Sequence, residues 1–218
     1  MTRRLLLLFA GLCLAGQSAL AQAPVDDEGE RLVNDFLTDV VTLEARFEQA
    51  LIDATDDVVE RSSGTLEIER PGRFRGSYSE PYEQQLVADG LNIWRYDVDL
   101  LQVTVKPQAE ALANTPALLL GGDAEALSQF RFDGHVVEND TTWVRMIPVD
   151  TSSGFERMEL GFQDGQLARM VFFDNLEQRT LVSLYDVVTN EPIDAERFVF
   201  EVPDDADLVG APAVADVP

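Results

Sequence analysis

The sequence predicts a mainly β domain in which antiparallel strands are joined by hairpins and accompanied by a few short helices. Apolar and polar residues alternate along most of the chain after position 43, as in strands with one buried face. Two Asp-Gly pairs, Asp89-Gly90 and Asp164-Gly165, mark hairpin turns. Helical spacing is confined to residues 28–40 and to a short region between residues 116 and 130.

Residues 1–21 have the features of a cleaved secretory signal. Arg3 and Arg4 precede an apolar run at residues 5–14, and residues 19–21 (Ala-Leu-Ala) supply a small-residue cleavage site. The apolar run is too short to cross a membrane as a helix. We therefore expect a mature chain that begins at Gln22 in the periplasm.

The only cysteine, Cys13, lies inside this apolar run and follows Leu12, where a lipidation motif has Gly or Ala. Lipidation at Cys13 is therefore not expected. Removal of the signal leaves no cysteine, so the mature chain cannot form a disulfide.

The first helix is predicted at residues 28–40, where an apolar stripe recurs at helical spacing: Leu32, Val33, Phe36, Leu37 and Val40. From Leu43 the period changes to two, because Leu43, Ala45 and Phe47 alternate with charged residues. This change predicts a strand, which ends in a polar turn at residues 53–57.

Residues 64–105 show the clearest alternation and one exception to it. Arg70 shares the parity of Leu66 and Ile68, so its side chain is expected to point toward the apolar side just before Pro71 ends the strand. An unpaired buried guanidinium is costly, so Arg70 needs acceptors. Further alternating segments follow and carry the apolar residues Phe74, Tyr78, Trp94, Tyr96, Leu101, Val103 and Val105.

The alternation is lost between residues 106 and 130, where two short helices are predicted. Thr115-Pro116 is typical of a helix start and Gly121-Gly122 of a helix end, so residues 117–120 form the first. Residues 124–130 form the second. Two interpretations stay open: a plug that completes the core, or a lid over a cavity that is hinged at the two glycines.

Strands resume after this region. Asp133-Gly134 is interpreted as a turn and residues 143–149 as a strand. Residues 155–162 and 166–173 form a hairpin through Asp164-Gly165. In this hairpin we expect Met158, Leu160 and Phe162 of the first strand to face Ala168, Met170 and Phe172 of the second strand, or the residues next to these.

The last long strand is predicted at residues 177–188. Phe198, Phe200 and Val202 are expected to close the sheet before Pro203. Residues 210–218 are mostly Ala, Val, Pro and Asp without a pattern, which predicts a disordered tail.

The charge of the chain excludes several partners. Sixteen basic residues stand against 40 acidic ones, a formal net charge of −24. Such a surface repels nucleic acid and anionic lipid headgroups, and the single lysine, Lys106, leaves no polybasic membrane patch. We expect neither nucleic-acid binding nor stable membrane insertion. The charge either serves solubility in a salty habitat or keeps the protein from sticking to membranes that it visits.

The familiar catalytic and metal-binding arrangements are missing from the sequence. One histidine, His135, without a mature cysteine makes zinc ligation improbable and excludes Ser-His-acid and thiol nucleophiles. No phosphate loop or dinucleotide fingerprint occurs, so no cofactor, metal or catalytic residue is expected. A hydrolase that uses a pair of carboxylates stays open, because 40 acidic residues form close pairs by chance.

An ordered set of motifs resembles one family, the LolA-type periplasmic outer-membrane lipoprotein carriers. The set comprises Arg70-Pro71-x-x-Phe74, then Asp89-Gly90-x-x-x-Trp94-x-Tyr96-Asp97-x-Asp99-Leu100-x-Gln102-Val103, Asn114-Thr115-Pro116 with Leu118 to Leu120, and Phe198-x-Phe200. The resemblance implies an incomplete, unclosed antiparallel β-barrel, covered on one side by short helices that form a lid. It implies a single domain at residues 22–209. The family often has an aromatic residue where this chain has Gly76, so that side-chain role is absent here or has moved to Tyr78.

The resemblance also implies the function: a periplasmic carrier that shields lipoprotein acyl chains and moves lipoproteins from the inner to the outer membrane. The implied partners are acylated lipoproteins as cargo, an inner-membrane ATP-driven release complex and an outer-membrane lipoprotein acceptor. We expect a monomer. An alternative with the same fold is a sensor that binds lipids or mislocalised lipoproteins and regulates a membrane partner.

Two groups of site residues follow. The expected lining of the acyl cavity is Phe47, Leu66, Ile68, Phe74, Tyr78, Trp94, Tyr96, Leu118, Met158 and Met170. The expected latch of the lid is Arg70, which donates hydrogen bonds to backbone carbonyls near Leu119, Leu120 or Gly121. The last carbonyls of a helix lack partners and carry partial negative charge, which a guanidinium satisfies.

Overall fold

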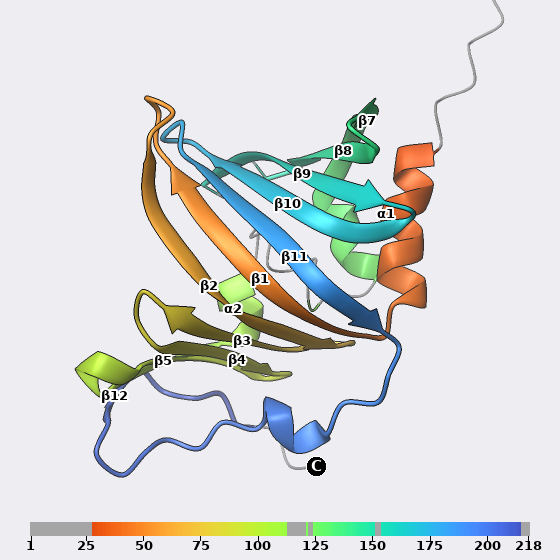
Figure 1. Cartoon of the computed structure of the whole chain (residues 1–218). Coiled ribbons are helices and arrows are strands. Elements are labelled where there is room, and N and C mark those ends of the chain that lie inside the picture. The colour runs from red at the N-terminus through yellow and green to blue at the C-terminus, as the bar shows by residue number, and fades with distance from the viewer. Residues whose placement is uncertain (1–27, 113–120, 122–123, 151–153, 215–218) are drawn as a thin grey trace, which may run out of the picture.

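The computed structural model describes residues 28–112, 121, 124–150 and 154–214 and is built on one sheet of 12 strands (Figure 1). The strands are β1 (Thr42–Ile52), β2 (Val58–Glu69), β3 (Arg73–Glu80), β4 (Gln84–Asp89), β5 (Asn92–Asp97), β6 (Gln102–Pro107), β7 (Phe130–Glu138), β8 (Thr141–Pro148), β9 (Phe155–Gln163), β10 (Gln166–Asp174), β11 (Arg179–Thr189) and β12 (Asp207–Val209). The helices are α1 (Glu28–Asp39), η1 (Val98–Leu100), α2 (Gln108–Leu112), η2 (Ala124–Gln129) and η3 (Ala195–Phe198).

The sheet is curved but not closed. Its order is β12-β6-β5-β4-β3-β2-β1-β11-β10-β9-β8-β7, so β7 and β12 are its edges. All neighbours are antiparallel except the short β12, which runs parallel to β6. Figure 1 shows the sheet bent around an interior that α1 flanks on one side. The predicted unclosed antiparallel barrel with few helices is confirmed.

The core lies on the inner, concave face of this sheet. Along β1, buried residues alternate with exposed ones from Leu43 to Phe47, as the sequence pattern predicted. The apolar stripe of α1 packs on the same face, where the ring of Phe36 meets that of Phe162 on β9 edge-on at 6.3 Å. The helix thereby covers apolar side chains that an open sheet alone would leave in water.

The hairpin β9–β10 forms at Asp164-Gly165, as predicted. Met158 lies opposite Phe172, and Leu160 lies opposite Met170. A register shift between Leu167 and Arg169 then brings Phe162 opposite Leu167 rather than Ala168.

One turn predicted for the second half of the chain is wrong. Asp133-Gly134 is not a turn but lies at a register shift within β7, between Phe132 and His135, where Gly134 has φ +90°. The hairpin occurs instead at Asn139 and Asp140. Both residues have positive φ, the geometry of a two-residue hairpin turn that Asn and Asp tolerate.

The region between β6 and β7 is described only in part. Residues 124–129 form the 3-10 helix η2, and Phe130 already belongs to β7, so the second predicted helix is one residue shorter than expected. The first predicted helix, at residues 117–120, lies outside the described residues.

The chain after β11 does not close the sheet at Phe198, Phe200 and Val202, contrary to prediction. It crosses the outer face of β3–β6 instead and forms η3 and then β12 (Figure 1). Phe198 is buried there, and so are three side chains on the outer face of β4 and β6: Val87, Val103 and Val105. The period-2 pattern of residues 198–202 therefore reflects contact with the outer face rather than a further strand.

The C-terminal segment is held at both of its ends. Near its start Arg197 forms an ion pair with the buried Glu67 of β2, and the carbonyl of Arg197 accepts a hydrogen bond from Arg75 at 3.0 Å. Near its end Ala213 donates to Oδ1 of Asn92 at 2.7 Å and accepts from Nδ2 of Asn92 at 3.1 Å. The expected disorder therefore does not begin at Gly210.

Residues 215–218 lie outside the described part. No helix within the described residues is long and apolar enough to span a membrane.

Gly64 allows close contact between the neighbouring strands β2 and β3. A Cβ on Gly64 would lie 2.0 Å from the carbonyl oxygen of Ser77, which is far inside contact distance. The neighbouring Gly76 has more room, because the nearest atom to its Cβ would be Cε2 of Tyr78 at 3.7 Å. The ring of Tyr78 thus lies beside Gly76, where the family often has an aromatic residue.

We predict that Gly64→Ala lowers the free energy of unfolding by about 1–3 kcal/mol, because overpacking forces the backbone of β3 to move. Gly76→Ala is the matched control and should change stability by less than about 0.5 kcal/mol. Denaturant unfolding of both variants measures the difference. Equal destabilisation would mean that the close contact at Gly64 does not limit packing.

Candidate functional site

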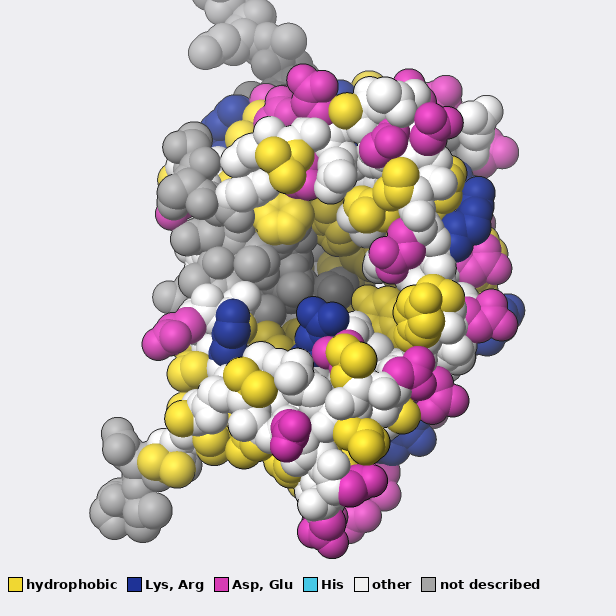
Figure 2. Space-filling view, turned by 90° about the vertical axis from the view of Figure 1, so that its left-hand side faces the viewer, with side chains coloured by type: hydrophobic (Ala, Val, Ile, Leu, Met, Phe, Trp, Pro, Cys, Tyr) yellow, Lys and Arg dark blue, Asp and Glu magenta, His cyan; other side chains and the backbone are white. Residues whose placement is uncertain are grey.

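The candidate site is the apolar inner face of the half-barrel. One contiguous cluster of buried side chains extends over this face from β7 to β4 and includes the apolar stripe of α1. Figure 2 views the molecule from the left-hand side of Figure 1, where the tips of the β1–β2 and β3–β4 hairpins lie. It shows a hollow with hydrophobic side chains on its visible wall and acidic side chains around the outside. This end is the mouth of the half-barrel.

Six of the residues predicted to line a cavity come together in this cluster. They lie on five strands and are all at most 7% exposed: Phe47, Leu66, Ile68, Phe74, Met158 and Met170. Phe47, Leu66, Ile68 and Phe74 come from the first half of the chain, whereas Met158 and Met170 come from the hairpin β9–β10. The two groups meet only because β1 pairs with β11 in the sheet. The curvature of the sheet turns their shared parity into one surface.

Tyr78 occupies the same face nearer the mouth. Its ring meets that of Phe47 edge-on at 5.0 Å, above Gly64, which lies between them in the sheet. Burial raises the pKa of the Tyr78 phenol. A groove of about 780 Å³ continues outward from Tyr78 to the exposed side chains of Tyr82 and Leu100. The lining of this outer part also includes Glu60, Arg61 and Glu83, so the apolar inner face passes into a mixed polar and apolar rim.

Two predicted lining residues, Trp94 and Tyr96, are on the wrong face. Their rings pack against Phe200 of the C-terminal segment at 5.5 and 6.2 Å, on the outer side of β5. The Trp94 indole also donates to Asp89 at 2.7 Å. Ile93, of the opposite parity, contacts the inner cluster instead. Leu118 lies outside the described residues.

Several other apolar residues of the inner face are missing from the predicted lining, among them Val144, Leu160, Phe162, Val182 and Leu184. The signal that could have found them is the alternation itself. Leu160 and Phe162 share the parity of Met158, and their opposite strand carries Met170 at the paired position. Continuing the parity along each strand assigns them to the inner face.

Arg70 points inward, as its parity predicted, and is only 9% exposed. Its guanidinium lies over the ring of Phe36 at 4.4 Å and donates to the carbonyls of Phe36 and Val40 at the C-terminal end of α1. Burial lowers the pKa of Arg70 to about 10, so the side chain stays charged near neutral pH. A cation is favoured at this negative end of the helix. Of the expected latch partners, Leu119 and Leu120 lie outside the described residues.

The turn that follows Arg70 makes hydrogen bonds to Gln108, the first residue of α2, and to Gly121. The amide of Gly72 donates to the carbonyl of Gly121 at 2.6 Å. The carbonyl of Gly72 accepts from Nε2 of Gln108 at 2.7 Å, and Oε1 of Gln108 accepts from the amide of Gly90 at 3.1 Å. Gly72 is therefore hydrogen-bonded both to Gln108 and to Gly121, which flank residues 109–120. Gly121 lies close to Phe74, because a Cβ on Gly121 would be 3.2 Å from the Phe74 ring.

Gln108 must both donate and accept, which gives a test of this junction. Gln108→Glu keeps the shape and the acceptor but replaces the donor to Gly72, so we predict a loss of about 1–3 kcal/mol in unfolding free energy. Gln85→Glu is the matched control, because the Gln85 amide oxygen accepts from Arg75 at 2.9 Å and a carboxylate accepts equally well. Denaturant unfolding at neutral pH compares the two, and equal effects would contradict the assigned role of Gln108.

Comparison with known proteins agrees with this geometry. A family model described as "Outer membrane lipoprotein carrier protein LolA" matches residues 38–201. The outer-membrane lipoprotein carrier protein of Halorhodospira halophila is 39% identical over 179 residues, which cover 82% of this chain and 84% of the relative. That of Nitrosomonas europaea is 34% identical over 210 residues and covers 96% of this chain and 99% of the relative.

A solved structure of an uncharacterized conserved protein from Thermus thermophilus shares the fold, with a TM-score of 0.52 at 16% identity over 84% of this chain and 97% of the other. The family model spans every strand from β1 to β11, and the two relatives match over most of the sequence. The chain therefore belongs to the LolA family of outer-membrane lipoprotein carrier proteins.

Proposed function

We propose that this protein is a periplasmic carrier that holds the acyl chains of lipoproteins against its inner face and moves lipoproteins from the inner to the outer membrane. The observation that carries the proposal is the continuous apolar surface inside an unclosed barrel. The relatives named outer-membrane lipoprotein carrier proteins support it. The protein would act by binding alone, without a cofactor or a catalytic step.

Acyl chains need such a surface to cross water. Each buried CH₂ group is worth about 0.8 kcal/mol, so a chain of ordinary length strongly disfavours free solution. Met146, Met158 and Met170 lie together on the inner face of β8, β9 and β10. Methionine side chains are flexible and fill irregular gaps, so they provide a wall that adapts to chains of different length.

The carrier exchanges cargo with two partners in this proposal: an ATP-driven release complex in the inner membrane and an acceptor lipoprotein in the outer membrane. It enters the periplasm after removal of residues 1–21 and acts as a monomer. The full sequence has a net charge of −24, and removal of Arg3 and Arg4 with the signal makes the mature protein more negative still. This charge opposes adsorption to anionic lipid surfaces, so cargo transfer depends on the partners.

Arg70 is proposed to latch the empty protein by bonding carbonyls near Leu119, Leu120 or Gly121. Its position supports this role, because Arg70 lies two residues before Gly72, whose amide already holds the carbonyl of Gly121. Charged hydrogen bonds of this kind contribute roughly 1.5–3 kcal/mol each. Acyl burial supplies enough free energy to break them.

We predict that Arg70→Leu lets cargo stay bound and reduces delivery to the acceptor more than uptake. Amide exchange across residues 117–122 should become faster, and a transfer assay to acceptor membranes reports delivery. Arg70→Lys, which keeps the charge but not the forked donors, should have an intermediate effect. Unchanged exchange in Arg70→Leu would mean that Arg70 latches nothing. Normal binding without transfer by the unaltered protein would favour a sensor over a carrier.

The cavity wall is tested by placing a carboxylate on each face of the sheet. Phe74→Glu, on the inner face, should weaken binding of a fluorescent diacyl probe by about tenfold or more, because a charge beside acyl chains is poorly solvated. Tyr78→Glu tests the same face nearer the mouth, where the charge can reach water and the fold is easier to keep. Phe173→Glu, of the outer parity on β10, is the matched control and should bind normally. Equal affinity of the folded inner-face variants and this control would contradict the proposed site.

A further inference from the structure

The outer face of the sheet has one covered half and one bare half. The C-terminal segment crosses β3–β6 and buries Val87, Val103 and Val105 beneath it. Figure 1 shows no described helix or strand in front of β9–β11. A groove of about 740 Å³ lies on this bare half and extends from β7 to β11.

The composition of this groove, which we term the outer groove, differs from the rest of the surface. Its lining combines apolar and aromatic side chains with arginines, above all Val136, Trp143, Val171, Arg145, Arg169 and Arg179. Trp and Arg dominate the energetically important positions of protein interfaces. Trp143 and Val171 are half-buried and Val136 is 57% exposed, so an apolar floor stays open to solvent.

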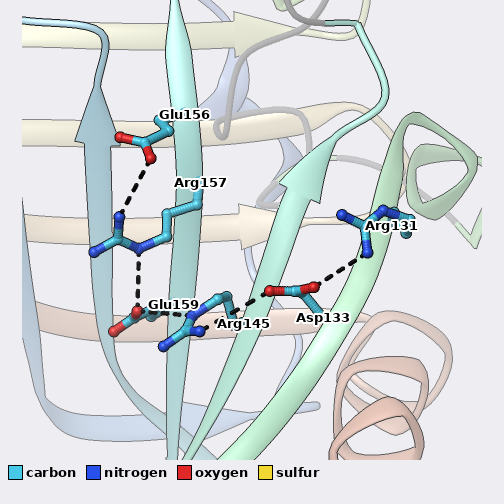
Figure 3. A network of polar contacts seen from close by, with 6 residues as sticks. All are labelled: Arg131, Asp133, Arg145, Glu156, Arg157 and Glu159. Atoms are coloured by element: carbon cyan, nitrogen blue, oxygen red, sulfur yellow. Dashed lines mark hydrogen bonds and ion pairs between the residues drawn. The ribbon is translucent and has the colours of Figure 1, made fainter.

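Most charges around the outer groove neutralise one another. Figure 3 shows a chain of alternating ion pairs across β7, β8 and β9. Arg131 pairs with Asp133 at 3.1 Å, and Arg145 pairs with Glu159 at 3.3 Å and lies 3.9 Å from Asp133. Beyond them, Arg157 pairs with Glu159 at 3.3 Å and lies 3.7 Å from Glu156. Three arginines and three carboxylates thus form a balanced network in a chain with 40 acidic and 16 basic residues.

Arg169 lies in the outer groove but is not part of this network. It is exposed on β10, beside Val171, and forms no ion pair with any described residue, whereas Arg179 pairs with Asp56. Elsewhere the surface repels negative charge at long range, because the net charge is −24. Glu138, at the β7 end of the groove, is likewise exposed and forms no ion pair with any described residue. The outer groove is therefore neutral overall and partly apolar, and its one available guanidinium lies at the β10 end, where it suits a single carboxylate flanked by apolar groups.

We propose that the outer groove is a docking surface for a carboxylate-bearing segment of a partner protein. Arg169 forms the ion pair with that carboxylate, and Trp143, Val171 and Val136 contact its apolar neighbours. The surface is on the opposite side of the sheet from Phe74 and Met158, so the partner binds without occupying the cavity. Its approach is oriented, since an acidic segment is repelled from the rest of the molecule.

The test uses the mature protein and two short fluorescein-labelled peptides, in which either glutamate or lysine alternates with valine. Anisotropy should detect binding of the glutamate peptide, which weakens as salt rises because the contact includes an exposed ion pair. Arg169→Glu should weaken this binding by about tenfold or more, as expected for loss of a charged hydrogen bond. Arg31→Glu on α1 is the matched control, because it changes the net charge equally at another exposed arginine. Both variants should bind the diacyl probe normally, which separates this surface from the cavity.

Several results would overturn the proposal. One is equal weakening by Arg31→Glu, which would assign the effect to net charge alone. Another is binding of the lysine peptide as strongly as the glutamate peptide. Binding only to vesicles that contain phosphatidylglycerol would identify a membrane surface as the occupant. Self-association that Arg169→Glu abolishes would identify a second copy of this chain.

Discussion

The structure depends on one constraint: an unclosed sheet with an apolar concave face needs something to cover that face. A closed barrel of 12 strands would satisfy its own edges, but this sheet ends at β7 and β12. Part of the exposed interior is covered by α1, whose Phe36 packs on Phe162. Arg70 then fixes the end of α1 to the sheet through the carbonyls of Phe36 and Val40. The remainder of the inner face extends to the mouth at Phe47 and Tyr78.

The two halves of the sheet differ in how their outer faces are covered. On the outer face, the C-terminal segment buries Phe198 and stacks Phe200 on Trp94, so β3–β6 have packed side chains on both sides. The strands on the other side of β1 have a packed inner face and a solvated outer face with balanced charges. Packing on both faces is therefore confined to one half of the described sheet, and the outer groove lies on the other half.

Much of this architecture was predictable from local pattern, and the errors have identifiable causes. Alternation located the strands and turned Arg70 inward, because parity on a strand determines the face. Parity does not say which face is inside when both faces are packed, and this misplaced Trp94 and Tyr96. Asp133-Gly134 resembles a turn in sequence, but a glycine with positive φ also suits an irregularity within a strand. The acceptors of Arg70 on α1 could not be predicted, because they come from a chain reversal that sequence spacing does not reveal.

The most direct test of the central claim is native mass spectrometry of the mature protein purified from the periplasm of producing cells without detergent. The account predicts a population with an intact acylated polypeptide bound, which Tyr78→Glu reduces and Phe173→Glu leaves unchanged. A protein that carries no acylated polypeptide under any of these conditions would contradict the claim that the inner face is a lipoprotein-binding surface.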